Sequence, residues 1–124
     1  MKKKNKLTVI ETNMGLFDFD VGTIYGDFNE AKKIIDKHFE EGEVTVWDNE
    51  DWKNPQGRCF SKRGYAPIIW LPRKPVTMYE HSALAHEALH AVCKMFEWAG
   101  IPWCRETEEV ATHALQRIVH NSLK

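Results

Sequence analysis

The residues of this sequence whose types and spacing could do chemistry are 86–90, which read HEALH. Imidazoles at positions i and i+4 of a helix lie on one face, so His86 and His90 can both bind one ion. Neutral imidazole nitrogens suit Zn²⁺ far better than Mg²⁺ or Ca²⁺, which prefer oxygen ligands. Glu87 directly follows the first histidine, where its carboxylate can act as general base toward a water on that ion. The motif therefore predicts a zinc site with two histidine ligands and a glutamate base.

A surface helix that carries two histidines and a glutamate by chance is the alternative interpretation of this motif. The flanking residues favour a well-defined helix: Thr77 and Glu80 form a capping-box pair, and Gly100 with Pro102 marks the end. The residues between are so apolar that we expect the helix to be buried on most of its circumference, where polar side chains need a partner such as a metal. The apolar residues are Leu84, Ala85, Ala88, Leu89, Ala91, Val92, Met95, Phe96 and Ala99.

A catalytic zinc ion usually takes three protein ligands and leaves one position for water. The predicted last helix, residues 105–121, returns antiparallel to the first after a short link, and Glu106, Glu108 and Glu109 lie near its start. An acidic residue there is the natural third ligand, although acidic residues in a first turn also favour the helix dipole. Cys93 shares the histidine face but lies about two turns, on the order of 10 Å, from His86. We expect this cysteine to be a small buried hydrophobic residue rather than a ligand.

The predicted helix at 81–99, the short loop and the segment EEVAT at 108–112 resemble the gluzincin layout of thermolysin-like zinc peptidases. They resemble more closely the small zincin-like metallopeptidases encoded in phage and prophage genomes. The resemblance covers roughly residues 68–119. It implies that His86, His90 and Glu109 bind Zn²⁺, and that Glu87 is the base in hydrolysis of a peptide bond. The metzincin arrangement is excluded, because no further histidine follows His90 at the required spacing.

Larger enzymes of this type add a His, Tyr or Arg that stabilises the oxyanion, and His113 is the best-placed candidate here. Tyr79, His81 and Arg105 are weaker candidates. Two other functions stay open: a zinc-stabilised binding or regulatory protein without turnover, and a zinc hydrolase of a non-peptide substrate. The presence of Glu87 favours catalysis, because a purely structural zinc site has no need of a base.

The length of 124 residues predicts one domain, 1–124, with a frayed basic terminus at residues 1–6. No apolar segment follows the lysines as in a signal peptide, and no run reaches the length of a membrane span. The formal charge of −1 gives no electrostatic argument for nucleic acid or membrane, and the three cysteines contain no C-x-x-C pair. We therefore expect a cytoplasmic protein, in the host cytoplasm if phage-encoded, that acts on a peptide or protein substrate. The oligomeric state is left open.

The elements that must position the motif form a predicted α+β fold, with a small, mainly antiparallel sheet packed on two or three helices. Residues 7–12 and 17–21 predict a hairpin, and 28–39 a helix that Asp27 caps and Gly42 ends. Further strands are expected at 44–47, 58–61 and 65–71, with a loop at 48–57. Pro67 suggests that the last strand lies at a sheet edge, where it could hold an extended peptide by strand addition. An ordinary blunted edge is the alternative.

Overall fold

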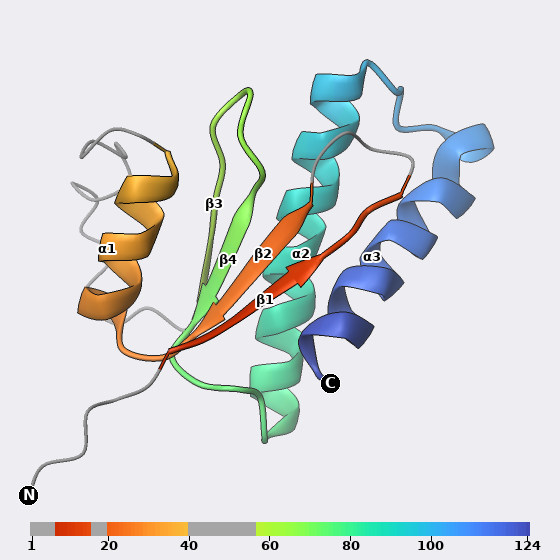
Figure 1. Cartoon of the computed structure of the whole chain (residues 1–124). Helices are drawn as coiled ribbons and strands as arrows, with labels where there is room; N and C mark the ends of the chain where they lie inside the picture. The colour runs from red at the N-terminus through yellow and green to blue at the C-terminus, as the bar shows by residue number, and fades with distance from the viewer. Residues whose placement is uncertain (1–6, 16–19, 40–56) are drawn as a thin grey trace, which may run out of the picture.

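Figure 1 shows the computed structural model of the chain, which describes residues 7–15, 20–39 and 57–124. The α+β class is confirmed. Its strands and helices are β1 (Thr8–Thr12), β2 (Val21–Tyr25), α1 (Phe28–His38), β3 (Arg58–Phe60), β4 (Ile68–Leu71), α2 (Met78–Ala99), a short 3-10 helix η3 (Arg105–Thr107) and α3 (Glu108–Ser122). The predicted frayed terminus, the strand at 44–47, most of the loop at 48–57 and the helix end at Gly42 lie outside the described residues.

The four described strands form one mixed sheet in the order β1-β2-β4-β3. β3 pairs with β4 in the antiparallel sense that the sequence predicts, and β1 is antiparallel to β2. The predicted hairpin placed its second strand at 17–21, but β2 begins only at Val21, and residues 17–19 lie outside the described residues. β2 and β4 are parallel, and the connection between them includes α1, which is the kind of long crossover that a parallel pair requires. The sheet lies between α1 on one face and α2 with α3 on the other (Figure 1).

The predicted edge position of the strand after Pro67 is wrong, because β4 lies inside the sheet between β2 and β3. All four of its residues are buried, as expected for a strand with helices on both faces. Pro67 precedes the strand, and its carbonyl accepts a hydrogen bond from the Gly22 amide at 3.0 Å. A proline at the start of a strand removes no donor from the ladder, so it is compatible with a central strand. Among the described strands, the edge on this side is β3.

The other edge of the sheet, β1, is covered by side chains of α3. Asn121 Nδ2 donates to the carbonyl of Glu11 at 3.1 Å and to Thr12 Oγ1 at 3.0 Å. Arg117 Nη1 donates to the carbonyl of Asn13 at 2.9 Å. These carbonyls lie two residues apart and therefore point to the same side of the chain. Because α3 already occupies them, this part of β1 resists pairing with another strand.

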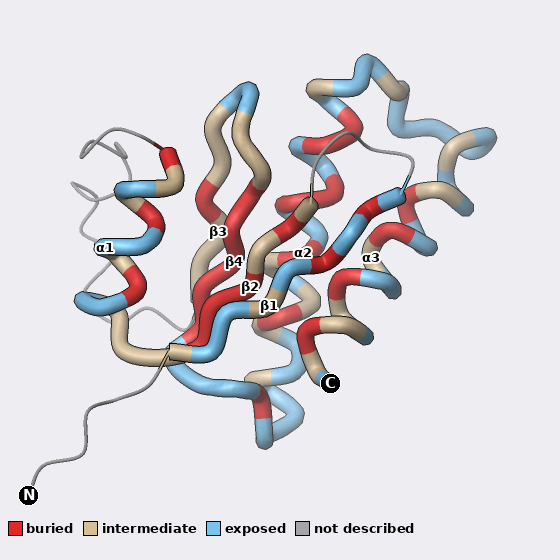
Figure 2. The backbone as a smooth tube through the Cα atoms, viewed as in Figure 1, coloured by how far each residue is buried: buried red, intermediate tan, exposed pale blue. Residues whose placement is uncertain are grey.

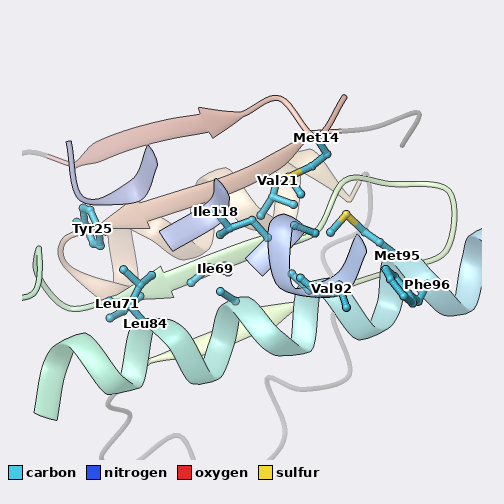
Figure 3. Packing of buried hydrophobic residues seen from close by; sticks show 14 residues of the cluster. Met14, Val21, Tyr25, Ile69, Leu71, Leu84, Val92, Met95, Phe96 and Ile118 are labelled. Carbon is cyan, nitrogen blue, oxygen red and sulfur yellow. The ribbon is translucent and has the colours of Figure 1, made fainter. Parts of the chain in front are cut away.

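One face of α2 forms the centre of the larger core (Figures 2 and 3). Leu84, Ala88, Val92 and Met95 are fully buried against the sheet and α3. The opposite face is open to solvent: the side chain of Leu89 is 41% exposed, and Cys93 is also exposed. The expectation that α2 is buried on most of its circumference, and Cys93 with it, is therefore wrong. An α-helix at the outside of a layered fold buries only the side that meets the neighbouring layers.

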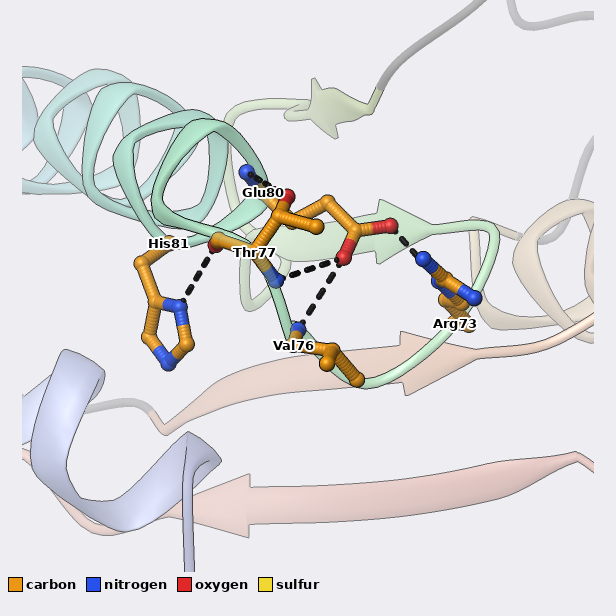
Figure 4. Close-up of polar contacts among 5 residues, drawn as sticks. All are labelled: Arg73, Val76, Thr77, Glu80 and His81. Carbon is orange, nitrogen blue, oxygen red and sulfur yellow. Dashed lines mark hydrogen bonds and ion pairs between the residues drawn. The ribbon is translucent and has the colours of Figure 1, made fainter.

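The start of α2 is held by the predicted capping box (Figure 4). Thr77 Oγ1 accepts from the Glu80 amide at 3.1 Å, and Glu80 Oε1 accepts from the amides of Thr77 and Val76, both at 3.0 Å. Arg73 adds a contact that the sequence did not predict, with its Nε 2.6 Å from Glu80 Oε2. This hydrogen bond, with the two amides, lowers the pKa of Glu80 to about 2. Gly100 ends the helix in the left-handed conformation at φ 70°, as predicted.

Within residues 7–15, 20–39 and 57–124, no helix is both long enough and apolar enough to cross a membrane.

Candidate metal centre

His86, Glu87 and His90 form a group on α2 whose donor atoms all lie within 4.8 Å of one another. It is the one such group of His, Cys, Asp and Glu residues in the described part of the chain. The two histidine Nε2 atoms are 3.2 Å apart. Two nitrogens bound to a tetrahedral ion at about 2.0–2.1 Å would be about 3.3–3.4 Å apart. The pair therefore has the spacing of two zinc ligands, and the predicted convergence of the histidines is confirmed.

The same 3.2 Å separation also fits a hydrogen bond, in which one neutral ring donates its Nε2–H to the other ring's Nε2. The rings meet nearly edge to face, with an interplanar angle of 82°. When the proton moves to Nδ1 of the donor ring, both Nε2 lone pairs become available to one ion. The hydrogen bond therefore holds both rings where a metal would need them.

Glu87 differs from the two histidines in exposure. Its side chain is 12% exposed, whereas that of His86 is 68% exposed. Glu87 Oε2 lies 4.0 Å from His86 Nε2, which is longer than the separation of about 3.3 Å expected for two ligands of one tetrahedral ion. The carboxylate is thus close to the metal position but set back from it. This geometry suits a group that contacts a water more than a group that binds the ion.

The stem of Glu87 lies against the start of β3, which the sequence did not predict. A Cβ built on Gly57 would lie 3.6 Å from Glu87 Cγ, and only 3.3 Å from both Leu71 Cγ and the Trp70 carbonyl oxygen. Gly57 also has a φ of +157°, a conformation that other residues rarely adopt. The absence of a side chain therefore lets the backbone approach α2 closely and form one wall beside the carboxylate. A glycine directly before a predicted strand was the available signal.

Cys59 of β3 lies on the same side of α2. Burial raises the pKa of its thiol to about 12; the negative charge of Glu87 adds to this shift and the positive charge of Lys94 opposes it. The thiol does not join the group of donor atoms formed by His86, Glu87 and His90. Cys59 is therefore a neighbour of the site in this structure.

The structure does not bring the predicted third ligand to the two histidines. Glu109 Oε2 contacts His113 Nε2 at 3.1 Å, and both side chains are exposed. They line a groove between α3 and the end of β1, together with Asn13 and Arg117. Glu109 as a zinc ligand stays a prediction, and it requires this carboxylate to leave His113.

The other acidic and oxyanion candidates have local roles. The pKa of Glu106 is lowered by hydrogen bonds from its own backbone amide and from Cys104, as expected for a carboxylate at a helix start. His81 Nδ1 donates to the Thr77 carbonyl at 2.8 Å, which commits that nitrogen to the first turn of α2. Tyr79 is 64% exposed near the same end, and Arg105 lies in η3. None of these residues joins the group around His86 among the described residues.

None of the family models, curated proteins or solved structures compared with this chain matches it. The zincin-like fold and the phage origin therefore rest on the sequence resemblance alone. The structure supports a coarser statement: the HEALH segment of α2 brings together a His-Glu-His group that could hold a metal ion.

Proposed function

We propose that this protein is a zinc-dependent peptidase, in which His86, His90 and Glu109 hold the metal and Glu87 is the general base. The observation that carries the proposal is the convergence of two histidine Nε2 atoms at 3.2 Å beside a carboxylate that is 12% exposed. A purely structural site would need the histidines but not the adjacent, shielded carboxylate. The combination of two histidine ligands with an adjacent carboxylate base therefore favours hydrolysis.

A bound zinc ion would supply Lewis acidity, which polarises a carbonyl and lowers the pKa of a water to about 7. The protein's own residues do the rest. His86 and His90 present their Nε2 atoms, and the short tether of one helical turn keeps both on the same side of α2. Glu87 accepts the proton of the attacking water and then donates it to the leaving amine. Its side chain is only 12% exposed, which limits the directions that the carboxylate can take during both transfers.

The substrate strand is assigned to β3 rather than to the strand first expected. β3 is an edge among the described strands, and the residue before it, Gly57, lies near Glu87, since a Cβ there would be 3.6 Å from Glu87 Cγ. An extended peptide paired with this edge would run past the carboxylate. The opposite edge, β1, is already occupied at Glu11 and Asn13 by side chains of α3.

The proposed activity is tested with an unbiased peptide library at neutral pH and added zinc. We expect cleavage that mass spectrometry detects, that a strong chelator abolishes and that zinc restores, because the two histidines alone cannot activate water without the ion. Cleavage that is unaffected by the chelator would contradict a metallopeptidase. Full zinc loading without cleavage of any peptide would favour the zinc-stabilised binding protein or a hydrolase of a non-peptide substrate. The exposure of the two histidines is the observation that suits the binding protein.

A separate prediction concerns the third ligand. Glu109 lies with His113 in the groove between α3 and the end of β1, so its proposed role as third ligand requires it to leave that groove and exchange His113 for the ion. Glu109→Gln should then weaken zinc binding by at least about tenfold, the lower end of what loss of a metal-site interaction costs. Glu106→Gln and Glu108→Gln are matched controls on the same helix end. Competition with a chromophoric chelator measures all three, and equal small effects would mean that these residues serve only the helix dipole.

A further inference from the structure

Hydrolysis of a peptide bond passes through a tetrahedral intermediate whose carbonyl oxygen becomes an oxyanion. A positive group close to that oxygen is usually a large part of the catalytic effect. The candidates from the sequence are engaged elsewhere: His113 contacts Glu109, and His81 is bound to the Thr77 carbonyl. A different cation, on the flank of α2, is better placed to contact the oxyanion.

Lys94 lies on the same side of α2 as the base. The helix is continuous from Met78 to Ala99, so Lys94 follows His90 by four residues, or about one turn. It follows Glu87 by seven residues, which brings the helix back to within about 20° of the same direction. Lys94 therefore lies along the axis from both groups and not across the helix from them.

The neighbouring strand places both charges on one flank. Glu87 and Lys94 act on the same thiol of β3, that of Cys59, whose pKa the carboxylate raises and the ammonium lowers. α2 contacts β3, and a Cβ built on Gly57, the residue before β3, would lie 3.6 Å from Glu87 Cγ, so Glu87 belongs to this flank. Glu87 and Lys94, which are about two helical turns apart, therefore both lie on the flank of α2 beside β3, the edge strand that we assign to the substrate.

The ammonium of Lys94 makes only a weak ion pair in the structure. Its Nζ lies 3.6 Å from Glu97 Oε2, and the side chains are 47% and 61% exposed. Exposed pairs of this kind contribute little, so the long lysine side chain can exchange Glu97 for a stronger partner. A negatively charged oxyanion that accepts a charge-assisted hydrogen bond is such a partner.

We propose that Lys94 donates a hydrogen bond from its ammonium to the oxyanion that forms on the scissile carbonyl. This inference rests on the proposed hydrolysis. The water oxygen bonds to the carbonyl carbon and its proton passes to Glu87, while the carbonyl π electrons move to the oxygen facing Lys94. When the carbon–nitrogen bond breaks, that electron pair re-forms the carbonyl and Glu87 delivers its proton to the amine. Lys94 keeps its protons throughout and acts through charge and hydrogen bonding alone.

The test measures anion binding at the metal and needs no substrate. The full chain is loaded with Co²⁺, whose visible spectrum reports ligands at the ion, and is titrated with azide and with neutral imidazole. Lys94→Gln should weaken azide binding by about tenfold, the scale of one charge-assisted hydrogen bond, and change imidazole binding by less than about twofold. Lys94→Arg should retain most of the azide affinity, because it keeps the charge and the donors.

Lys33→Gln is the matched control, because Lys33 also pairs with a glutamate three residues away, at 3.4 Å from Glu30, but on α1. Equal loss of azide affinity in both variants would mean a general charge effect and would overturn the proposal, as would unchanged affinity in Lys94→Gln. Failure of the protein to bind cobalt, or cobalt binding that survives loss of both histidines, would instead overturn the proposed function. Once a substrate is in hand, Lys94→Gln should lower kcat by about 10²-fold with little change in KM, the effect of losing one oxyanion donor.

Discussion

Replacing both His86 and His90 by alanine is expected to change the zinc content from about one ion per chain to none. Both side chains are exposed, so the double variant loses little packing and should fold like the wild type. The two proteins should therefore differ in thermal stability only when zinc is present. At a free zinc concentration of about 100 times Kd, binding stabilises the wild type by about 2.7 kcal/mol, which raises its Tm and leaves that of the variant unchanged.

Metal analysis of the purified proteins and thermal melts with zinc or with a chelator measure this difference. His120→Ala is the control, since it removes an exposed histidine of α3 at the groove beside β1. It should bind zinc like the wild type. Full zinc content in the His86 and His90 double variant would show that the ion binds elsewhere.

Glu87→Gln is expected to lower turnover by at least about 10²-fold, the usual scale for loss of a general base, and to leave zinc content unchanged. Glutamine keeps the length and nearly the shape of the side chain, so folding should be unaffected. It removes the carboxylate that we propose as acceptor of the proton of the attacking water. The prediction separates a base from a ligand, because loss of a ligand would lower metal affinity as well.

Steady-state rates on any cleaved peptide, together with metal analysis, measure this effect. Glu97→Gln is a suitable control, because Glu97 lies on the same helix with a side chain that is 61% exposed and contacts Lys94. It should retain most of the activity. Equal turnover by Glu87→Gln and the wild type would mean a contaminating peptidase or a different mechanism.

Local patterns in the sequence determined α2 and the pairing of its histidines. The Thr77 capping box and the Gly100 end depend on residues within a few positions of each other. The convergence of His86 and His90 depends only on the helical period, so it is independent of the rest of the fold. An antiparallel partner for β1 was predicted for a similar reason, because the two strands follow one another along the chain, although β2 begins at Val21, where the predicted strand ended.

The position of β4 was decided by tertiary structure alone. Pro67 indicated an edge, yet β4 pairs with β2 on one side and β3 on the other. The parallel partner comes from more than forty positions earlier, at Gly22 and its neighbours, and no local pattern encodes that pairing. The order of strands follows from burying both faces of the sheet at once.

Which side of each helix faces the solvent also depended on its neighbours. The apolar run of α2 is broad enough to allow several orientations, and contact with the sheet and α3 on one side left Leu89 and Cys93 exposed. Contacts between α2 and β3 also brought Gly57 near Glu87, whereas the contact of Glu109 with His113 is an i,i+4 pair within α3. Spacing within one helix determines which residues share a face, whereas contacts between distant segments determine what that face meets. The sequence by itself therefore determined the grouping of His86, Glu87 and His90 on one helix, and only the tertiary structure decided their surroundings.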